Sequence, residues 1–311
     1  MRYRGDIGND QRQNGGSLLK LSQMWYYGYT SLRCYEPGSK VFWGKNNCRG
    51  VKEIESKCLA NNVTFTNYNS PIDEYKFRDI SLKNEYIFDI SKPVILVFGL
   101  GESLDKFEIQ VSLRDEFLKR GYKVSQVGSR EGCELFGFHS FPDFMYSRSI
   151  SESNKVVLFN HFIKNIEETE NSDVLIIGVP GGIMPFNKTI TNKFGILAYE
   201  ICQAIRPDAT ILSTYLYDDY NHLEKLVNII QYKFNIEINC INISNKKVDF
   251  DETYNDNKIH FITLDSNYVQ SIKQNMSQSI PIFNIVNGED KSLMSDFLID
   301  TLNKYAIAEF V

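Results

Sequence analysis

The feature that most constrains the fold is the segment Val94–Phe98, a continuous apolar run followed at once by Gly99-Leu100-Gly101. A short apolar run that ends in glycine is typical of a parallel strand buried on both faces of a sheet. The residues from Lys106 to Lys119 then place apolar side chains at a largely helical spacing, and Gly121 ends the pattern. The sequence therefore predicts a strand, a glycine loop and a helix in succession.

The same alternation of strands and helices continues toward the C-terminus. Predicted strands are 122–127, 174–179, 209–213, 237–243, 259–264 and 282–286, and predicted helices are 155–168, 194–205, 221–234, 268–276 and 290–305. Strands that alternate with helices form a parallel sheet with right-handed crossovers. We therefore expect an α/β fold, a parallel sheet flanked by helices.

The chain of 311 residues divides into parts of different composition. Residues 1–17 are rich in Gly, Asn, Asp and Arg and predict a flexible leader. Residues 18–92 hold no periodicity for long, which predicts a small or truncated N-terminal domain. Residues 93–311 carry the alternating pattern and form the predicted main domain.

Charge and composition exclude several classes of protein. A net charge of −5 without a basic cluster argues against nucleic acid as the main partner. We find neither an apolar stretch of about 20 residues nor an export signal, so we expect a cytoplasmic protein without a membrane partner. The six cysteines form no C-x-x-C pair, so no metal ligands are predicted. Cys133, in a loop beside Arg130, is the best candidate for a reactive thiol.

The glycine loop before Lys106 is the first candidate site. A strand that passes into a helix in this way exposes unpaired backbone N–H groups at the positive end of the helix dipole, where phosphate binds. Gly99, Gly101, Glu102 and Ser103 would line such a site, and Lys106 would reach the terminal phosphates. An ordinary turn with a surface lysine is the alternative.

Three positions depart from the pattern G-x-x-x-x-G-K-[ST] and its usual surroundings. Asp105 stands where glycine is expected, and Phe107 stands where a hydroxyl would bind magnesium. The third predicted strand ends in a turn with Gly181 and Gly182 at the same edge of the sheet, but Gly178 replaces the acid that many nucleotide hydrolases carry there. These changes argue against Mg²⁺ and leave ATP or GTP as the expected cofactor.

The glycines also allow a dinucleotide-binding interpretation. Gly99-x-Gly101 opens a G-x-G-x-x-G fingerprint, although Leu104 holds the third glycine position. Arg130 follows the second predicted strand, where an arginine would contact the 2′-phosphate of NADP. An NADP-type oxidoreductase therefore stays open as an alternative.

The loop 130–145 carries a candidate catalytic residue, His139. An imidazole titrates near neutrality and serves as a general acid or base. The alternative is that His139 is a neighbour of four packing phenylalanines, Phe136, Phe138, Phe141 and Phe144. The sequence contains no nucleophile elbow.

Several segments resemble a known family. PVILVFGLGE, KFEIQ, GYKVSQVGSR, LFGFHSFP and IIGVPGGIMP are similar to a bacterial, mainly clostridial family of peptide maturation system proteins, over about Pro93 to Asp249. That family is associated with clusters that make ribosomally synthesised, modified peptides, often with radical-SAM enzymes. The loop Gly99 to Lys106 also resembles that of dethiobiotin synthetase-like P-loop proteins. The resemblance implies a P-loop NTPase-like fold, which also serves metal-insertion GTPases.

Together the motifs and the resemblance predict an accessory protein of peptide maturation that binds a nucleotide or another phosphorylated ligand through an altered P-loop. Its partners would be the precursor peptide or the modifying enzymes, and a homo-oligomer stays open. As an enzyme it would catalyse an NTP-dependent activation or ligation, with Lys106 on the phosphates and the backbone of Gly181 and Gly182 facing them. The alternative from another class is a non-catalytic scaffold that has kept the fold without the nucleotide.

Overall fold

The computed structural model describes residues 40–43, 51–62, 64–67, 86–217, 220–274 and 280–308. The chain divides into two compact units, Met1–Ser70 and Pro71–Val311. The leader predicted for residues 1–17 lies outside the described residues.

The first unit contains a strand–helix–strand element. β1 (Lys40–Trp43) and β2 (Thr64–Asn67) pair in parallel, and α2 (Val51–Ala60) connects them. The sequence pattern did not predict this helix, because α2 has no wide apolar stripe: Cys58 is buried whereas Leu59 is 71% exposed. The region predicted to be irregular therefore includes regular α/β structure.

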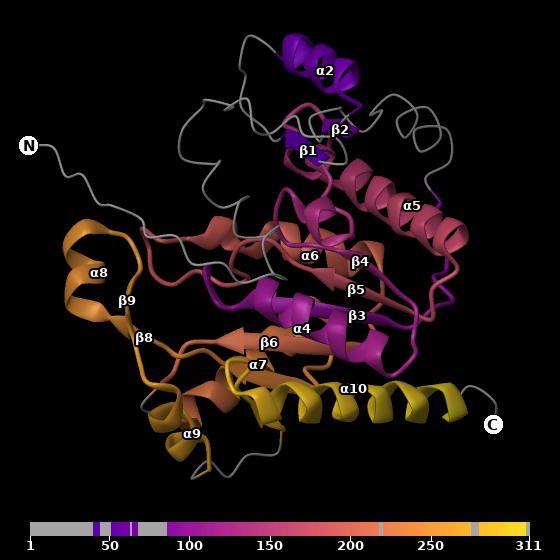
Figure 1. Ribbon diagram of the computed structural model, residues 1–311. Coiled ribbons are helices and arrows are strands. Elements are labelled where there is room, and N and C mark those ends of the chain that lie inside the picture. Colours follow the sequence, from indigo (N-terminus) through magenta and orange to yellow (C-terminus); the bar gives the residue numbers. More distant parts are fainter. Residues whose placement is uncertain are drawn as a thin grey trace, which may run out of the picture. The chain divides into compact units, whose positions relative to one another are not determined.

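The second unit is built around a parallel sheet of six strands (Figure 1). The strands are β3 (Val94–Gly99), β4 (Val124–Val127), β5 (Val174–Gly178), β6 (Ala209–Thr214), β7 (Cys240–Ile243) and β10 (Ile282–Phe283). Their order is β10-β7-β6-β3-β5-β4, so the first strand lies in the middle of the sheet and β4 lies at an edge. The predicted α/β class and parallel sheet are confirmed.

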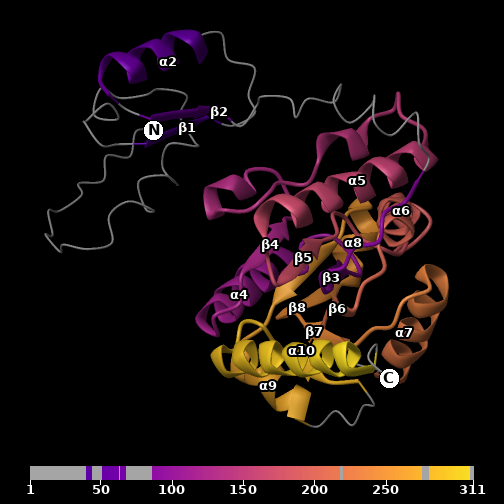
Figure 2. The same ribbon diagram turned by 90° about the vertical axis from the view of Figure 1, so that its right-hand side faces the viewer.

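Helices cover both faces of this sheet (Figure 2). One face carries α4 (Lys106–Lys119) and α10 (Gly288–Ala308), and the other carries α5 (Glu152–Glu170), α6 (Ile196–Ala204) and α7 (Tyr220–Phe234). Ile95 and Val97 of β3 point into the core on the α4 and α10 face, and Leu96 and Phe98 point into the core on the opposite face. Because neighbouring residues of a strand point to opposite faces, burial of both faces requires the continuous apolar run. Within the described ranges, no helix is both long and apolar enough to cross a membrane.

One predicted strand, 259–264, is not part of the parallel sheet. β8 (Lys246–Asp249) and β9 (His260–Thr263) form a separate antiparallel pair, with α8 (Phe250–Asp256) between them and α9 (Ser266–Gln274) after them. Ile262 is 53% exposed, whereas strands inside the main sheet are buried on both faces. The strand itself is confirmed, but its expected place in the parallel sheet was wrong, because periodicity cannot tell a strand of the sheet from one that pairs with a partner nearby in sequence. We call β8, α8 and β9 the arm.

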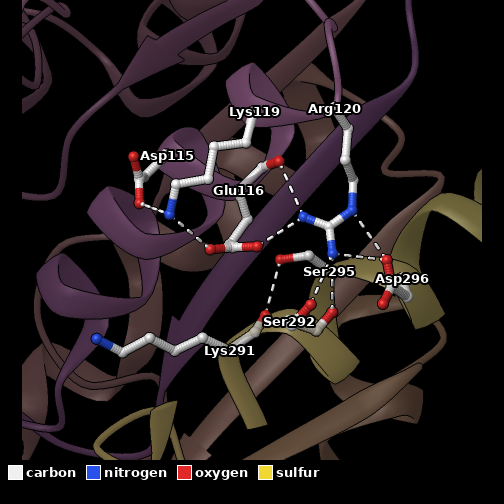
Figure 3. Close-up of polar contacts among 8 residues, drawn as sticks. All are labelled: Asp115, Glu116, Lys119, Arg120, Lys291, Ser292, Ser295 and Asp296. Carbon is white, nitrogen blue, oxygen red and sulfur yellow. Dashed lines mark hydrogen bonds and ion pairs between the residues drawn. The ribbon is translucent and has the colours of Figure 1, made fainter. Parts of the chain in front are cut away.

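Arg120 joins the C-terminal end of α4 to α10 (Figure 3). Its guanidinium donates hydrogen bonds to the Glu116 carboxylate at 2.6 Å, to Ser292 Oγ at 2.8 Å and to Asp296 Oδ1 at 2.9 Å. The side chain is 24% exposed. Lys119, one residue earlier, is 59% exposed, and among the described residues it pairs only within α4, with Asp115 and Glu116.

We predict that Arg120→Ala lowers the free energy of unfolding by about 1–2 kcal/mol, because it removes charge-assisted hydrogen bonds between two helices. Lys119→Ala is the matched control on the same helix and should leave the free energy of unfolding close to that of the wild type, because exposed ion pairs contribute little. Urea denaturation of the two variants checks this. Equal effects of both substitutions would contradict the role given to Arg120.

Candidate phosphate-binding site

The loop between β3 and α4 lies at the carboxyl edge of the sheet, where the connections diverge. α4 leaves β3 toward one face, whereas α6, which follows the neighbouring strand β5, covers the other face. Ligands of open α/β sheets bind at such a point. The loop after β3 and the turn after β5 therefore occupy the expected ligand position.

The backbone N–H groups from Gly101 to Glu108 have no hydrogen-bond acceptor within the described residues. The groups on either side are paired: Leu100 N donates to Ser213 O at 2.9 Å, and Ile109 N donates to Asp105 O at 2.8 Å. Ser103 and Asp105 have left-handed φ angles of 58° and 52°. Left-handed residues next to right-handed ones make concave nests of N–H groups that bind anions. The loop therefore forms a cradle of donors for an anion.

Lys106, the first residue of α4, folds back over this loop. Its Nζ donates to Gly101 O at 3.4 Å and to Gly181 O, and the residue is 8% exposed. No carboxylate in the described part of the chain pairs with it. Burial lowers the pKa of Lys106 to about 8; the charge of Glu102 opposes the shift and the charge of Arg130 adds to it. A buried ammonium group without a counter-ion indicates an anion site.

Two glycines make room for this arrangement. A Cβ at Gly99 would lie 2.8 Å from Lys106 Cδ, and a Cβ at Gly182 would lie 2.8 Å from Gly101 Cα. Ile183 N also donates to Gly99 O at 3.1 Å, so the turn after β5 is joined to the loop backbone. The structure thus brings the loop together with Gly181 and Gly182, which the sequence placed at the same edge of the sheet.

Asp105 adopts the backbone conformation that a glycine would have at this position. Its φ of 52° is left-handed, a region that Asp enters at lower cost than most residues. Asp105 Oδ1 accepts a hydrogen bond from Lys246 Nζ at 2.9 Å, and Lys246 also donates to Ser103 O. Lys246 is the first residue of β8, so the arm supplies the counter-charge for the acidic side chain in the loop.

The positions expected to bind a metal hold other groups. The ring of Phe107 lies under the guanidinium of Arg130, with 4.0 Å between Cζ and the ring centroid, and it also contacts Phe136 edge-on at 5.1 Å. At Gly178, a Cβ would lie 2.3 Å from Gln110 Cδ, because the buried Gln110 side chain fills that space. These two positions therefore lack the hydroxyl and the carboxylate that Mg²⁺ prefers, and they do not fit this ion.

His139 lies away from the loop. Its backbone pairs with the edge strand, since His139 N donates to Gln126 O at 2.9 Å and Gly128 N donates to His139 O at 2.7 Å. Its imidazole pairs with Glu170, the last residue of α5, and Ser125 of β4 donates to the same carboxylate. No contact in the described part of the chain joins His139 to Lys106, so the two predicted catalytic residues are not brought together.

The loop around His139 is packed by aromatic side chains. Phe138, Phe141 and Phe144 are buried, as the packing alternative required, but Phe136 is 49% exposed and contacts Phe107 instead.

Cys133 in the same loop is fully buried, and burial raises the pKa of its thiol to about 11. The hypothesis of a reactive Cys133 was wrong, because a thiol that stays protonated is a poor nucleophile.

Three residues of the site were not identified from the sequence. Gln110 fills the space beside Gly178, Lys246 pairs with Asp105, and the buried Tyr215 packs against Gly101, where a Cβ would lie 2.6 Å from its Oη. Gln110 follows Lys106 by one helical turn, so helix geometry could have suggested it. Lys246 and Tyr215 carry no such signal, because their positions depend on how distant segments pair.

The strand order does not favour the dinucleotide-binding interpretation. In the order 3-2-1-4-5-6 of dinucleotide-binding domains, the second strand lies beside the first. Here β5 lies between β4 and β3. The NADP hypothesis placed Arg130 against a 2′-phosphate. In the structure Arg130, which follows β4, is stacked on Phe107, next to Lys106.

No family model and no curated protein matches the chain. Among solved structures, the chain is similar to a DUF1611 family protein from Anabaena variabilis, with a TM-score of 0.51 and 11% identity over 86% of this chain and 72% of that one.

Two further structures are similar to the chain with lower scores. The hydrogenase maturation factor HypB from Archaeoglobus fulgidus has a TM-score of 0.38 and 12% identity over 73% of this chain and 95% of that one. A plasmid partition protein from Borrelia burgdorferi bound to AMPPNP has a TM-score of 0.38 and 11% identity over 70% of this chain and 100% of that one. Similarity at these identities concerns the fold alone. With its strand order and lysine-bearing glycine loop, the second unit has a P-loop NTPase-like α/β fold.

Proposed function

We propose that this protein binds the phosphate groups of a nucleotide in the loop Gly99 to Lys106. The observation that carries the proposal is the run of N–H groups from Gly101 to Glu108 without acceptors among the described residues. Phosphate oxygens would accept these hydrogen bonds and would provide the counter-charge for Lys106. ATP and GTP are both candidates, because these contacts recognise phosphate and not the base.

Lys106 has a defined part in this proposal. In the free protein its Nζ donates to the carbonyl oxygens of Gly101 and Gly181. A bound phosphate would replace these neutral acceptors by charged ones, which form hydrogen bonds about twice as strong. Donors that are already oriented stabilise negative charge without reorganisation, which is also what an NTP-dependent activation or ligation would need.

A scaffold that uses the fold without a reaction is the second candidate. Phe107 and the filled space at Gly178 favour it, because metal-dependent hydrolysis needs ligands at both places. The two candidates differ in one property: a scaffold without a ligand gains no stability from nucleotide.

We predict that Lys106→Met stabilises the ligand-free protein at neutral pH and removes its response to nucleotide. A fall of the lysine pKa from 10.5 to about 8 corresponds to an unfavourable burial of about 3 kcal/mol, which methionine would not have. Thermal unfolding with ATP, GTP, NADPH or no ligand tests both parts, since a hundredfold excess over Kd adds about 2.7 kcal/mol. Gln110 and the rest of α4 remain unchanged in this variant.

The effect of Lys106 depends on pH in a defined direction. Between about pH 8 and 10.5 the unfolded chain keeps the lysine proton that the folded protein has lost, so the wild type gains stability as the pH rises through this range. The stability difference from Lys106→Met should therefore shrink there. A flat nucleotide panel for the wild type would instead leave the scaffold as the better account.

We also propose a role in the maturation of a ribosomally synthesised peptide, with the precursor peptide or its modifying enzymes as partners. The support is the resemblance of the segments between Pro93 and Asp249 to peptide maturation system proteins. Deleting the gene in its host should leave the precursor unmodified, as measured by mass spectrometry of the peptide. Restoration by the wild type but not by Lys106→Ala would link this role to the loop, and an unchanged peptide product after deletion would exclude it.

A further inference from the structure

A bound triphosphate brings several negative charges, which in P-loop proteins are partly neutralised by Mg²⁺. Phe107 has no hydroxyl and Gly178 has no carboxylate to bind the metal, and the side chain of Gln110 occupies the space beside Gly178. Lys106 alone would leave much of that charge without compensation. The chain therefore needs another cation beside the terminal phosphates.

Arg130 is placed to supply that cation. Its Cζ lies 4.0 Å from the centroid of the Phe107 ring, and Phe107 directly follows Lys106 at the start of α4. A guanidinium stacked on an aromatic ring keeps its N–H groups free at the edges, where they bind phosphate in a bidentate manner. Cys133 Sγ also donates to Arg130 O at 3.1 Å, which anchors the backbone behind the side chain.

Among the residues that the structure describes, the guanidinium of Arg130 has only a weak ion-pair partner. Its side chain is 56% exposed, and the single carboxylate that pairs with it in the described part of the chain is Glu108, at 3.9 Å. The charge of Arg130 contributes to the lowered pKa of Lys106, so the two cations interact in the free protein. Two like charges held near each other are relieved by an anion between them.

We propose that Arg130, stacked on Phe107, takes the place of Mg²⁺ and binds the terminal phosphates together with Lys106, so that the ligand binds without a divalent cation. This inference rests on the proposed phosphate site. To the proposed site it adds the form in which the ligand binds, which is the free polyphosphate anion and not its magnesium complex.

The test is isothermal titration of the full chain with ATP and with inorganic tripolyphosphate, each in MgCl₂ and in EDTA. The wild type should bind both ligands in EDTA at least as tightly as in MgCl₂, because magnesium removes the free anion that the site is proposed to bind. Arg130→Ala should raise Kd about tenfold or more, because one charge-assisted contact is lost, and Arg130→Lys should fall between the two. Arg206→Ala, at an exposed arginine just before β6 and thus at the opposite edge of the sheet, is the matched control and should bind like the wild type.

The outcomes separate this inference from the proposed function. Binding that strengthens at least about tenfold with magnesium, or that Arg130→Ala leaves unchanged, would overturn the inference while the phosphate site itself stands. The absence of binding by either ligand under both conditions would overturn the proposed function and the inference together. Binding in EDTA that is at least as tight as in MgCl₂, and that Arg130→Ala weakens, supports both.

Discussion

Backbone N–H groups that have no acceptor in the described part of the protein are the constraint on which the site depends. Those from Gly101 to Glu108 lie where the buried strand β3 passes into α4, and an unsatisfied polar group is costly unless water or a ligand pairs with it. The fold keeps them available: β3 is held in the centre of the sheet, and the turn after β5 packs its backbone against the loop. The buried position of Lys106 follows from the same packing.

The altered positions of the loop form a consistent set. Asp105 takes a glycine-like conformation, and Lys246 from the arm pairs with its carboxylate. Phe107 stacks under Arg130, and Gln110 occupies the space beside Gly178. Each replacement therefore has its own partner, which is expected when a site has been adapted to a different ligand form and not simply lost.

The sequence was sufficient to predict those parts of the structure that depend on the local pattern of residues. The apolar run of β3, the glycine loop and the position of Lys106 at the start of α4 were all predicted, because burial on both faces and a strand-to-helix turn leave direct marks in the sequence. The antiparallel pairing of β9 and the contact of Lys246 with the loop were not predicted, since they depend on which segments meet in space. For the same reason the pairing of His139 with Glu170 was not predicted.

Amide hydrogen exchange of the loop tests the central claim most directly. With saturating tripolyphosphate, peptides that cover Gly101 to Glu108 should exchange more slowly, because their N–H groups acquire acceptors, while peptides from α10 should exchange as before. Protection confined to the loop and to the neighbouring turn at Gly181 and Gly182 is the result that this account predicts. Unchanged exchange in the loop under conditions where tripolyphosphate binds elsewhere on the protein would contradict it.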